Sequence, residues 1–245
     1  MHANRFKSNV FAWLTSLFCF WLLVFFIQRQ VFLLYHLKEV SVLPWKEVLL
    51  SNGHGLVMDL SFAAYLVTIP FLIAVTTLFA GKQRIPMTAI HVINVILLFI
   101  TILTGIADIA LSVQWGTKTT AMALSFVDTS REFASLVFSF SNLGLFLLFA
   151  LLFSAFLYIY NLVFRKTALK VKSRLLLLPA TLLCLGLLLL AARGGWGKMP
   201  LDRSSVHYSL HPVLNNAALN GDWNLSEILV KPAKNTNPYT FFRAE

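Results

Sequence analysis

Long apolar stretches, separated by short polar breaks, dominate the pattern of this chain. They run roughly over residues 10–35, 56–80, 87–111, 136–164 and 175–192. Each has about the 18–25 residues that a helix needs to cross a hydrocarbon layer of about 30 Å. In lipid the backbone must satisfy its own hydrogen bonds, so each stretch is expected to be a helix. The sequence therefore predicts an all-α membrane protein with a five-helix transmembrane bundle, which forms a domain over residues 1–192.

Residues 193–245 are the polar part that follows the fifth stretch. Gly194, Gly195 and Gly197 indicate an abrupt end of the helix. The segment Asn215–Asn220 is compatible with a short helix, but apolar periodicity is weak throughout. We interpret this part as a juxtamembrane linker that lies on the membrane surface, and not as a folded domain.

Composition supports a membrane protein. Of the 245 residues, 58% are hydrophobic and 12% are charged, which is typical of helical membrane proteins. The net charge of +10 comes mainly from short segments beside the predicted spans, where anionic headgroups and topology account for basic residues. No aromatic-interleaved basic patch or nucleic-acid motif occurs. Membrane lipids, and not nucleic acid, are therefore the expected partners.

The distribution of basic residues predicts the orientation in the membrane. Three alternate segments carry nine basic residues and no acidic one, namely Arg5, Lys7, Lys82, Arg84, Arg165, Lys166, Lys170, Lys172 and Arg174. The loops on the other side balance four basic residues with four acidic ones. We therefore expect the N-terminus in the cytoplasm and, after five spans, the part from residue 193 on the extracytoplasmic side.

Charged side chains in or beside the predicted spans are the candidate site residues. With this orientation, Arg29, Asp59, Asp108 and Arg193 all lie near the outer surface. Charges at membrane depth are costly and usually face partners or water. One hypothesis is that these four residues form intramembrane ion pairs, for example Arg29 with Asp59 or Asp108. The alternative is that Asp59 complements the dipole of its own helix, while Arg29 and Arg193 extend to the headgroups.

The sequence predicts no catalytic, cofactor-binding or metal site in this chain. It has no phosphate-binding loop, His-Glu-x-x-His or Gly-x-Ser-x-Gly motif. His207 and His211 are four residues apart, but Pro212 disfavours helical geometry at His211, and no third ligand has a diagnostic spacing. Cys19 and Cys184 fall in apolar stretches and are interpreted as buried small side chains.

Several short segments near the predicted outer surface carry a family resemblance. After the fifth stretch these are Arg193-Gly194-Gly195, Pro200, Ser204-Ser205, Leu214–Asn220 and Trp223-Asn224-Leu225. Earlier in the chain they are His54-Gly55-Leu56, Asp59-Leu60-Ser61, Tyr65-Leu66, and Asp108 followed by Trp115-Gly116. Together they resemble the N-terminal transmembrane region of lipoteichoic-acid-synthase-like proteins. These belong to the membrane sulfatase and phosphoglycerol-transferase group of the alkaline phosphatase superfamily.

The resemblance implies a membrane anchor in a bacterial cytoplasmic membrane that holds a catalytic domain at the outer face. In such proteins this domain has a threonine nucleophile and a divalent metal, typically manganese. It transfers phosphoglycerol or phosphoethanolamine, or cleaves a sulfate or phosphate ester. This chain ends at Glu245, where that domain would begin, so no catalytic residue can be placed here and the chain alone is expected to be inactive. Gly221-Asp222 departs from the family, which more often has a proline there.

Two other functions stay open from the residues alone. A small transporter or channel could use Asn94, Thr101 and Thr104 of the third stretch to line a path, although such residues also form ordinary hydrogen bonds between helices. No inverted symmetry or pair of broken helices is evident. The other possibility is a regulatory or scaffolding membrane subunit.

Overall fold

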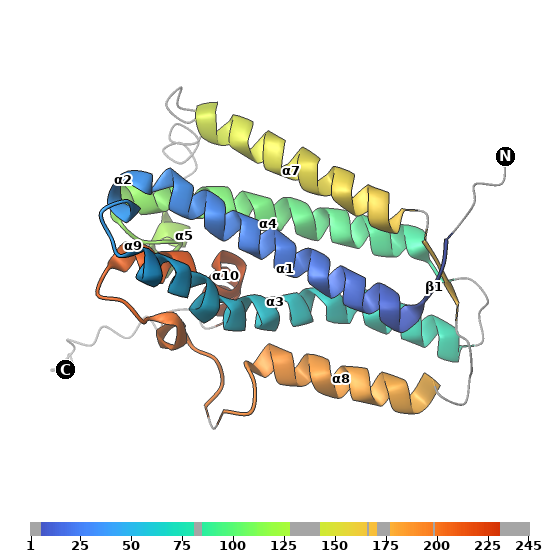
Figure 1. The fold of residues 1–245 in the computed structure, drawn as a ribbon. Coiled ribbons are helices and arrows are strands. Elements are labelled where there is room, and N and C mark those ends of the chain that lie inside the picture. Colours follow the sequence, from blue (N-terminus) through green and yellow to red (C-terminus); the bar gives the residue numbers. More distant parts are fainter. Residues whose placement is uncertain are drawn as a thin grey trace, which may run out of the picture.

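The computed structural model describes residues 6–80, 85–127, 143–165, 167–170, 177–197 and 199–230. Long helices run side by side along one axis (Figure 1), namely α1 (Val10–Tyr35), α3 (Trp45–Phe79), α4 (Met87–Trp115), α7 (Leu143–Phe164) and α8 (Leu177–Arg193). Shorter helical elements are α2 (Leu37–Val40), α5 (Ala121–Val127), the 3-10 helix η2 (Arg203–Val206), α9 (Pro212–Ala218) and α10 (Gly221–Val230). The described chain is predominantly helical, as the sequence predicts.

Four helices, α1, α3, α4 and α7, are long and apolar enough to cross a membrane. The bounds of α1 coincide with the first predicted stretch. Helix α8 is apolar but shorter, and its 17 residues extend about 26 Å at 1.5 Å per residue.

The beginnings of the predicted fourth and fifth stretches, at 136–142 and 175–176, lie outside the described residues. The same holds for the basic segments at 81–84 and 171–176, and for the chain after residue 230.

Helix α3 begins at Trp45, well before the second predicted stretch. The sequence from Ser51 to Gly55 looks like a break before the span, yet it is helical. A Cβ atom at Gly55 would collide with the guanidinium group of Arg29 and approach the carbonyl oxygen of Ala218. Gly55 therefore permits a close contact between elements and does not end the helix.

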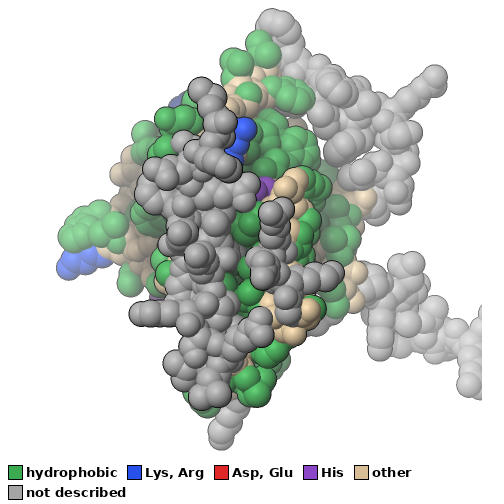
Figure 2. Space-filling view, turned by 90° about the vertical axis from the view of Figure 1, so that its right-hand side faces the viewer, with side chains coloured by type: hydrophobic (Ala, Val, Ile, Leu, Met, Phe, Trp, Pro, Cys, Tyr) green, Lys and Arg blue, Asp and Glu red, His purple; other side chains and the backbone are tan. Residues whose placement is uncertain are grey.

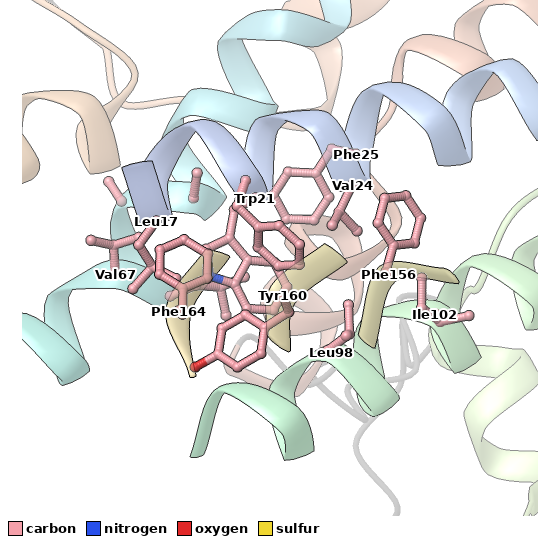
Figure 3. Close-up of a cluster of buried hydrophobic side chains, with 14 of the residues drawn as sticks. Leu17, Trp21, Val24, Phe25, Val67, Leu98, Ile102, Phe156, Tyr160 and Phe164 are labelled. Atoms are coloured by element: carbon pink, nitrogen blue, oxygen red, sulfur yellow. The ribbon is translucent and has the colours of Figure 1, made fainter. Parts of the chain in front are cut away.

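An apolar core joins the long helices. Helix α1 contacts α3 and α4, α3 contacts α8, and α4 contacts α7. Figure 3 shows Trp21 of α1 among aromatic side chains of α7. The ring of Phe20 meets those of Phe156 and Phe164 edge to face, at 6.3 and 5.9 Å between centroids. Such aromatic pairs contribute about 0.5–1.5 kcal/mol beyond their buried area and hold α7 against α1.

The periphery of the bundle is apolar. Large side chains on α7 and α8, such as Leu151 and Leu189, are exposed. Viewed onto the end opposite α9, the described side chains around the bundle are largely hydrophobic (Figure 2). Cys19 of α1 is exposed on this surface, which corrects the prediction of two buried thiols, while Cys184 is partly buried. The position of Cys19 on the outward face of α1 suits a side chain that contacts lipid.

A short pairing of strands lies at the end of the bundle where α1 begins. Strand β1 (Phe6–Asn9) pairs in parallel with β2 (Thr167–Lys170), and Phe6 is opposite Thr167. In Figure 1 this pairing lies at the end of the bundle opposite α9 and α10. It ties the segment before α1 to the connection between α7 and α8, and it was not expected from the sequence.

The segment from residue 201 to 230, called the tail here, packs onto the other end of the bundle. Helix α9 contacts α3 and α1, and α10 contacts α4 and α3. A small apolar cluster joins the tail to α3 through Met58, Val206, Ala218, Leu219 and Trp223. The interpretation as a linker lying on the surface therefore underestimates how deeply this segment is packed.

Candidate functional site

The candidate site is a group of buried charges where the tail meets the bundle. Arg29 of α1 and Asp59 of α3 form an ion pair of 2.7 Å, and their side chains are 4% and 2% exposed. Nε of Arg29 also donates to the carbonyl oxygen of Ala217, at 3.0 Å. The other carboxylate oxygen of Asp59 accepts a hydrogen bond of 2.9 Å from the amide of Asn220. The ion pair between α1 and α3 thus binds the tail at two residues, Ala217 and Asn220.

Asp108 of α4 has a different cation for its partner. Its Oδ1 accepts hydrogen bonds from the backbone N and the hydroxyl of Thr119, at 3.0 and 2.7 Å. Nζ of Lys118 lies 3.8 Å from its Oδ2 and donates to the carbonyl oxygen of Leu219 at 2.6 Å. Lys118 is therefore a bridge from α4 to the tail, parallel to the one that Arg29 makes.

A third carboxyl group, that of Asp222, comes from the tail itself and is also buried. Burial, together with the neighbouring Asp108 carboxylate, raises the pKa of Asp222 from 3.8 to about 7. Hydrogen bonds to Thr104 and Thr101 of α4 act in the opposite direction. Burial also lowers the pKa of Lys118, against the attraction of Asp108.

The tail approaches α4 too closely for a larger residue. A Cβ atom at Gly221 would collide with Oδ2 of Asp108. Next to this contact, the amide of Asn224 donates to the carbonyl oxygen of Thr119 at 2.8 Å. The side chain of Asn220 also accepts from the backbone N of Trp223 at 2.9 Å, where α10 begins, as helix-capping residues do.

A small cavity of about 30 Å³ lies among these groups. Its lining includes Arg29, Asp59, Asp108, Lys118 and Asp222. The buried Oδ2 atom of Asp108 accepts no hydrogen bond from any residue that the structure describes. A space of this size and polarity suits about one or two water molecules and no larger organic ligand.

A second set of contacts fixes the start of the tail to α3. The ring of Tyr208 stacks on that of His54, with centroids 4.4 Å apart. Its hydroxyl donates to the carbonyl oxygen of Glu47 at 2.8 Å, and the Ser209 hydroxyl donates to the Glu47 carboxylate at 2.9 Å. The Asn215 amide closes the loop by accepting from the backbone N of Tyr208 and Ser209.

Of the four candidate charges, three lie at the cavity and the fourth, Arg193, does not. It brings Arg29 and Asp59 into direct contact, and it places Asp108 on the same cavity but with Lys118 as its ion-pair partner. Arg193 is exposed at the end of α8, does not line that cavity, and donates to the carbonyl oxygen of Gly197 at 3.2 Å. Arg29 points inward to the tail, so its guanidinium does not extend to headgroups.

Sequence reasoning did not assign a role to Lys118, Asp222 or the asparagines of the tail. In the sequence, Lys118 is simply one of the four basic residues in the loops of the predicted outer side. The one visible signal is the density of asparagine, with Asn215, Asn216, Asn220 and Asn224 within ten residues. Each of these side chains makes a hydrogen bond that braces the tail or joins it to the bundle.

The chemistry of the site is ionic and structural. Within the described residues, no three His, Cys, Asp or Glu side chains are grouped so that they could hold a metal ion. Two of the three carboxyl groups have a cation within ion-pair distance, and the other contacts of the site involve amides, threonine hydroxyls and the backbone. The arrangement can hold the tail and a proton or water.

No family model, curated protein or solved structure matches this chain. The resemblance to lipoteichoic-acid-synthase-like proteins therefore stays a prediction from the residues themselves.

Proposed function

We propose that this chain is a membrane anchor that fixes its tail, and any protein part joined to it, at the extracytoplasmic end of a five-helix bundle. The observation that carries this proposal is that cationic side chains from the bundle bind main-chain carbonyls of the tail. Arg29 binds Ala217 and Lys118 binds Leu219. A flexible tether would not need buried charges, because burying a charge costs several kcal/mol unless it is paired and hydrogen-bonded.

The arrangement of the ends supports this orientation. The tail and the beginning of α1 lie at opposite ends of the bundle (Figure 1). Basic residues without acidic ones flank the end where α1 begins, which favours that end for the cytoplasm. With α8 as a fifth, short span, the tail emerges on the extracytoplasmic side. The surrounding apolar surface then contacts lipid in the cytoplasmic membrane of a bacterium.

The family resemblance suggests what the anchor holds. We infer a sulfatase-like catalytic domain, with a divalent metal such as manganese, that transfers phosphoglycerol or phosphoethanolamine or hydrolyses an ester. An anchored domain meets lipid-borne substrates at a high effective concentration. A docked tail adds a defined height and orientation above the membrane, which a loose linker does not provide.

A transporter or channel finds less support in this site. The cavity among the buried charges has about 30 Å³, and the tail covers it. Arg29 and Asp59 are bound to each other and to the tail, so they are not available to a passing ion. For these reasons we do not propose transport.

Limited proteolysis tests the anchor directly. In right-side-out membrane vesicles, we expect an added protease to leave α9 and α10 of the wild-type chain intact. The variants Asp59→Asn and Arg29→Met should be cleaved in the tail at least about ten times faster, since about 1.4 kcal/mol of lost docking gives a factor of ten. Gln30→Ala is the matched control, because Gln30 lies beside Arg29 but bonds to Asn52 of α3. Equal cleavage rates in all four proteins would refute the docked anchor.

A further inference from the structure

The buried charges at the tail do not balance one another. Three carboxyl groups, those of Asp59, Asp108 and Asp222, share the cavity with two cationic side chains. Asp59 is matched by Arg29 and Asp108 by Lys118. Among the described residues, no Lys or Arg lies within ion-pair distance of Asp222. An ionised Asp222 would thus be a third negative charge without a partner of its own.

The surroundings of Asp222 accommodate its neutral form better. An unpaired carboxylate is costly to bury, and two carboxyl groups at one site raise the affinity of one of them for a proton. Hydrogen bonds to Thr104 and Thr101 favour the ionised form of Asp222, but these neutral hydroxyls supply no charge that would balance it. Oδ2 of Asp108, on the same cavity, has no hydrogen-bond donor among the described residues. A proton at this place removes the excess charge and supplies a donor.

We propose that the docked tail binds one proton, which Asp222 carries beside Asp108, so that an acidic extracytoplasmic side strengthens docking and an alkaline one weakens it. This inference rests on the proposed anchor function and deepens it, because it makes the anchor's rigidity depend on pH. When the tail leaves the cavity, Asp222 enters water and releases the proton. No other reactant is needed.

The sign follows from linkage. The pKa of Asp222 is about 7 in the docked state, against 3.8 for the ordinary group. Between these values the docked tail holds a proton that the undocked tail has lost, so docking weakens about tenfold for each pH unit. Above about pH 7 both states are ionised and the dependence levels off. The stabilisation is thus fully present at low pH and is lost as the pH rises through about 7.

The charged groups that face Asp222 come from every neighbouring element. These are Arg29 on α1, Asp59 on α3, Asp108 on α4 and Lys118 on the connection after α4. Histidines also titrate in this range, with an ordinary pKa of about 6.5. A histidine gains positive charge as the pH falls, and His54 stacks on Tyr208 of the tail, so a pH effect on docking has to be assigned to a residue by substitution. The variant Asp222→Asn therefore separates the two causes, because it removes only the titration of Asp222.

Hydrogen exchange measured by mass spectrometry tests the proposal on the full chain in lipid nanodiscs. Amides of α10 are followed from about pH 5 to about pH 8.5, and each rate is divided by its intrinsic rate at that pH. We expect protection of α10 to fall about tenfold per pH unit up to about pH 7 and then to level off. In Asp222→Asn the protection should not depend on pH, because the amide is neutral throughout. Amides in the middle of α1 and α4 serve as the internal reference.

The possible outcomes are distinct. A flat profile in the wild type, or an unchanged slope in Asp222→Asn, would overturn the proton-binding inference and leave the anchor standing. Rapid exchange of α10 at every pH would overturn the docked anchor itself. If the reference amides of Asp222→Asn lose protection, the variant is not properly folded. The protonation of Asp222 is then tested in the wild type by infrared spectroscopy. A protonated-carboxyl band that titrates with a midpoint near pH 7 supports the proposal, and its absence at pH 5 overturns it.

Discussion

Replacing Asp59 with Asn removes the charge that Arg29 meets in the interior of the protein. The two side chains are 2.7 Å apart and almost completely buried. In Asp59→Asn the guanidinium of Arg29 is left without a counterion, and one of the two acceptors on residue 59 becomes a donor. Arg29→Met removes the other partner and also the hydrogen bond to Ala217. We expect both variants to undock the tail and to destabilise the bundle where it is held.

The magnitude follows from the burial of the pair. Breaking a buried ion pair by removing one partner costs about 3–5 kcal/mol, because an uncompensated charge stays behind. Removing both charges leaves no such charge, so the double variant should be less destabilised than the sum of the single variants, by about 2 kcal/mol. The pair of Arg203 and Glu227, at 2.8 Å with side chains 38% and 13% exposed, is the contrast, since pairs that stay in contact with solvent contribute less, with about 0–1 kcal/mol for surface pairs.

The assay is a double-mutant cycle on the purified chain in one detergent. Tryptophan fluorescence reports the unfolding of the chain, whose six tryptophans include Trp223 of the tail, and circular dichroism reports the helices. The free energy of unfolding is measured for the wild type, both single variants, the double variant and Arg203→Ala. Strict additivity of Asp59→Asn and Arg29→Met, or an effect no larger than that of Arg203→Ala, would refute the reasoning from a buried pair.

Three further substitutions test the packing. Gly221→Ala places a methyl group against Asp108 and should increase proteolysis of the tail at least about tenfold, corresponding to 1.4 kcal/mol; cleavage at the wild-type rate would contradict the close approach. Gly55→Ala meets Arg29 in the same way and should lower the melting temperature, whereas Gly53→Ala, which meets nothing, should not. Trp21→Ala removes a fully buried side chain and should cost about 3–5 kcal/mol of unfolding free energy, measured by denaturation in detergent; a loss below about 1 kcal/mol would argue against the core of Figure 3.

The long helices could be predicted because lipid imposes length and apolar composition on each of them. The bounds of α1 came directly from this pattern. The beginning of α3 did not, since glycine in a polar stretch is ambiguous. It marks the end of a helix or the place where another element comes close, and Gly55 is of the second kind. Only the position of Arg29 in space decides between these two meanings.

The candidate site was predictable in part for a similar reason. A charge inside an apolar stretch is conspicuous, so Arg29, Asp59 and Asp108 could be found, and helix orientation placed them at one depth. Lys118 and Asp222 lie in polar segments, where a charge is ordinary. Their burial depends on the tail folding back onto the bundle, a long-range contact between segments about a hundred residues apart, for which local patterns give no signal.

Labelling of single cysteines tests the central claim, an extracytoplasmic tail docked on a membrane bundle, most directly. Cys19 and Cys184 are first replaced by Ala, and a membrane-impermeant maleimide is added to intact cells. Met199→Cys, at a position that is 86% exposed, should react at once. Val206→Cys, at a fully buried position in the tail, should react only after denaturation. Reaction of Met199→Cys only after the cells are opened would contradict the orientation, and equally fast reaction of Val206→Cys would contradict the docking.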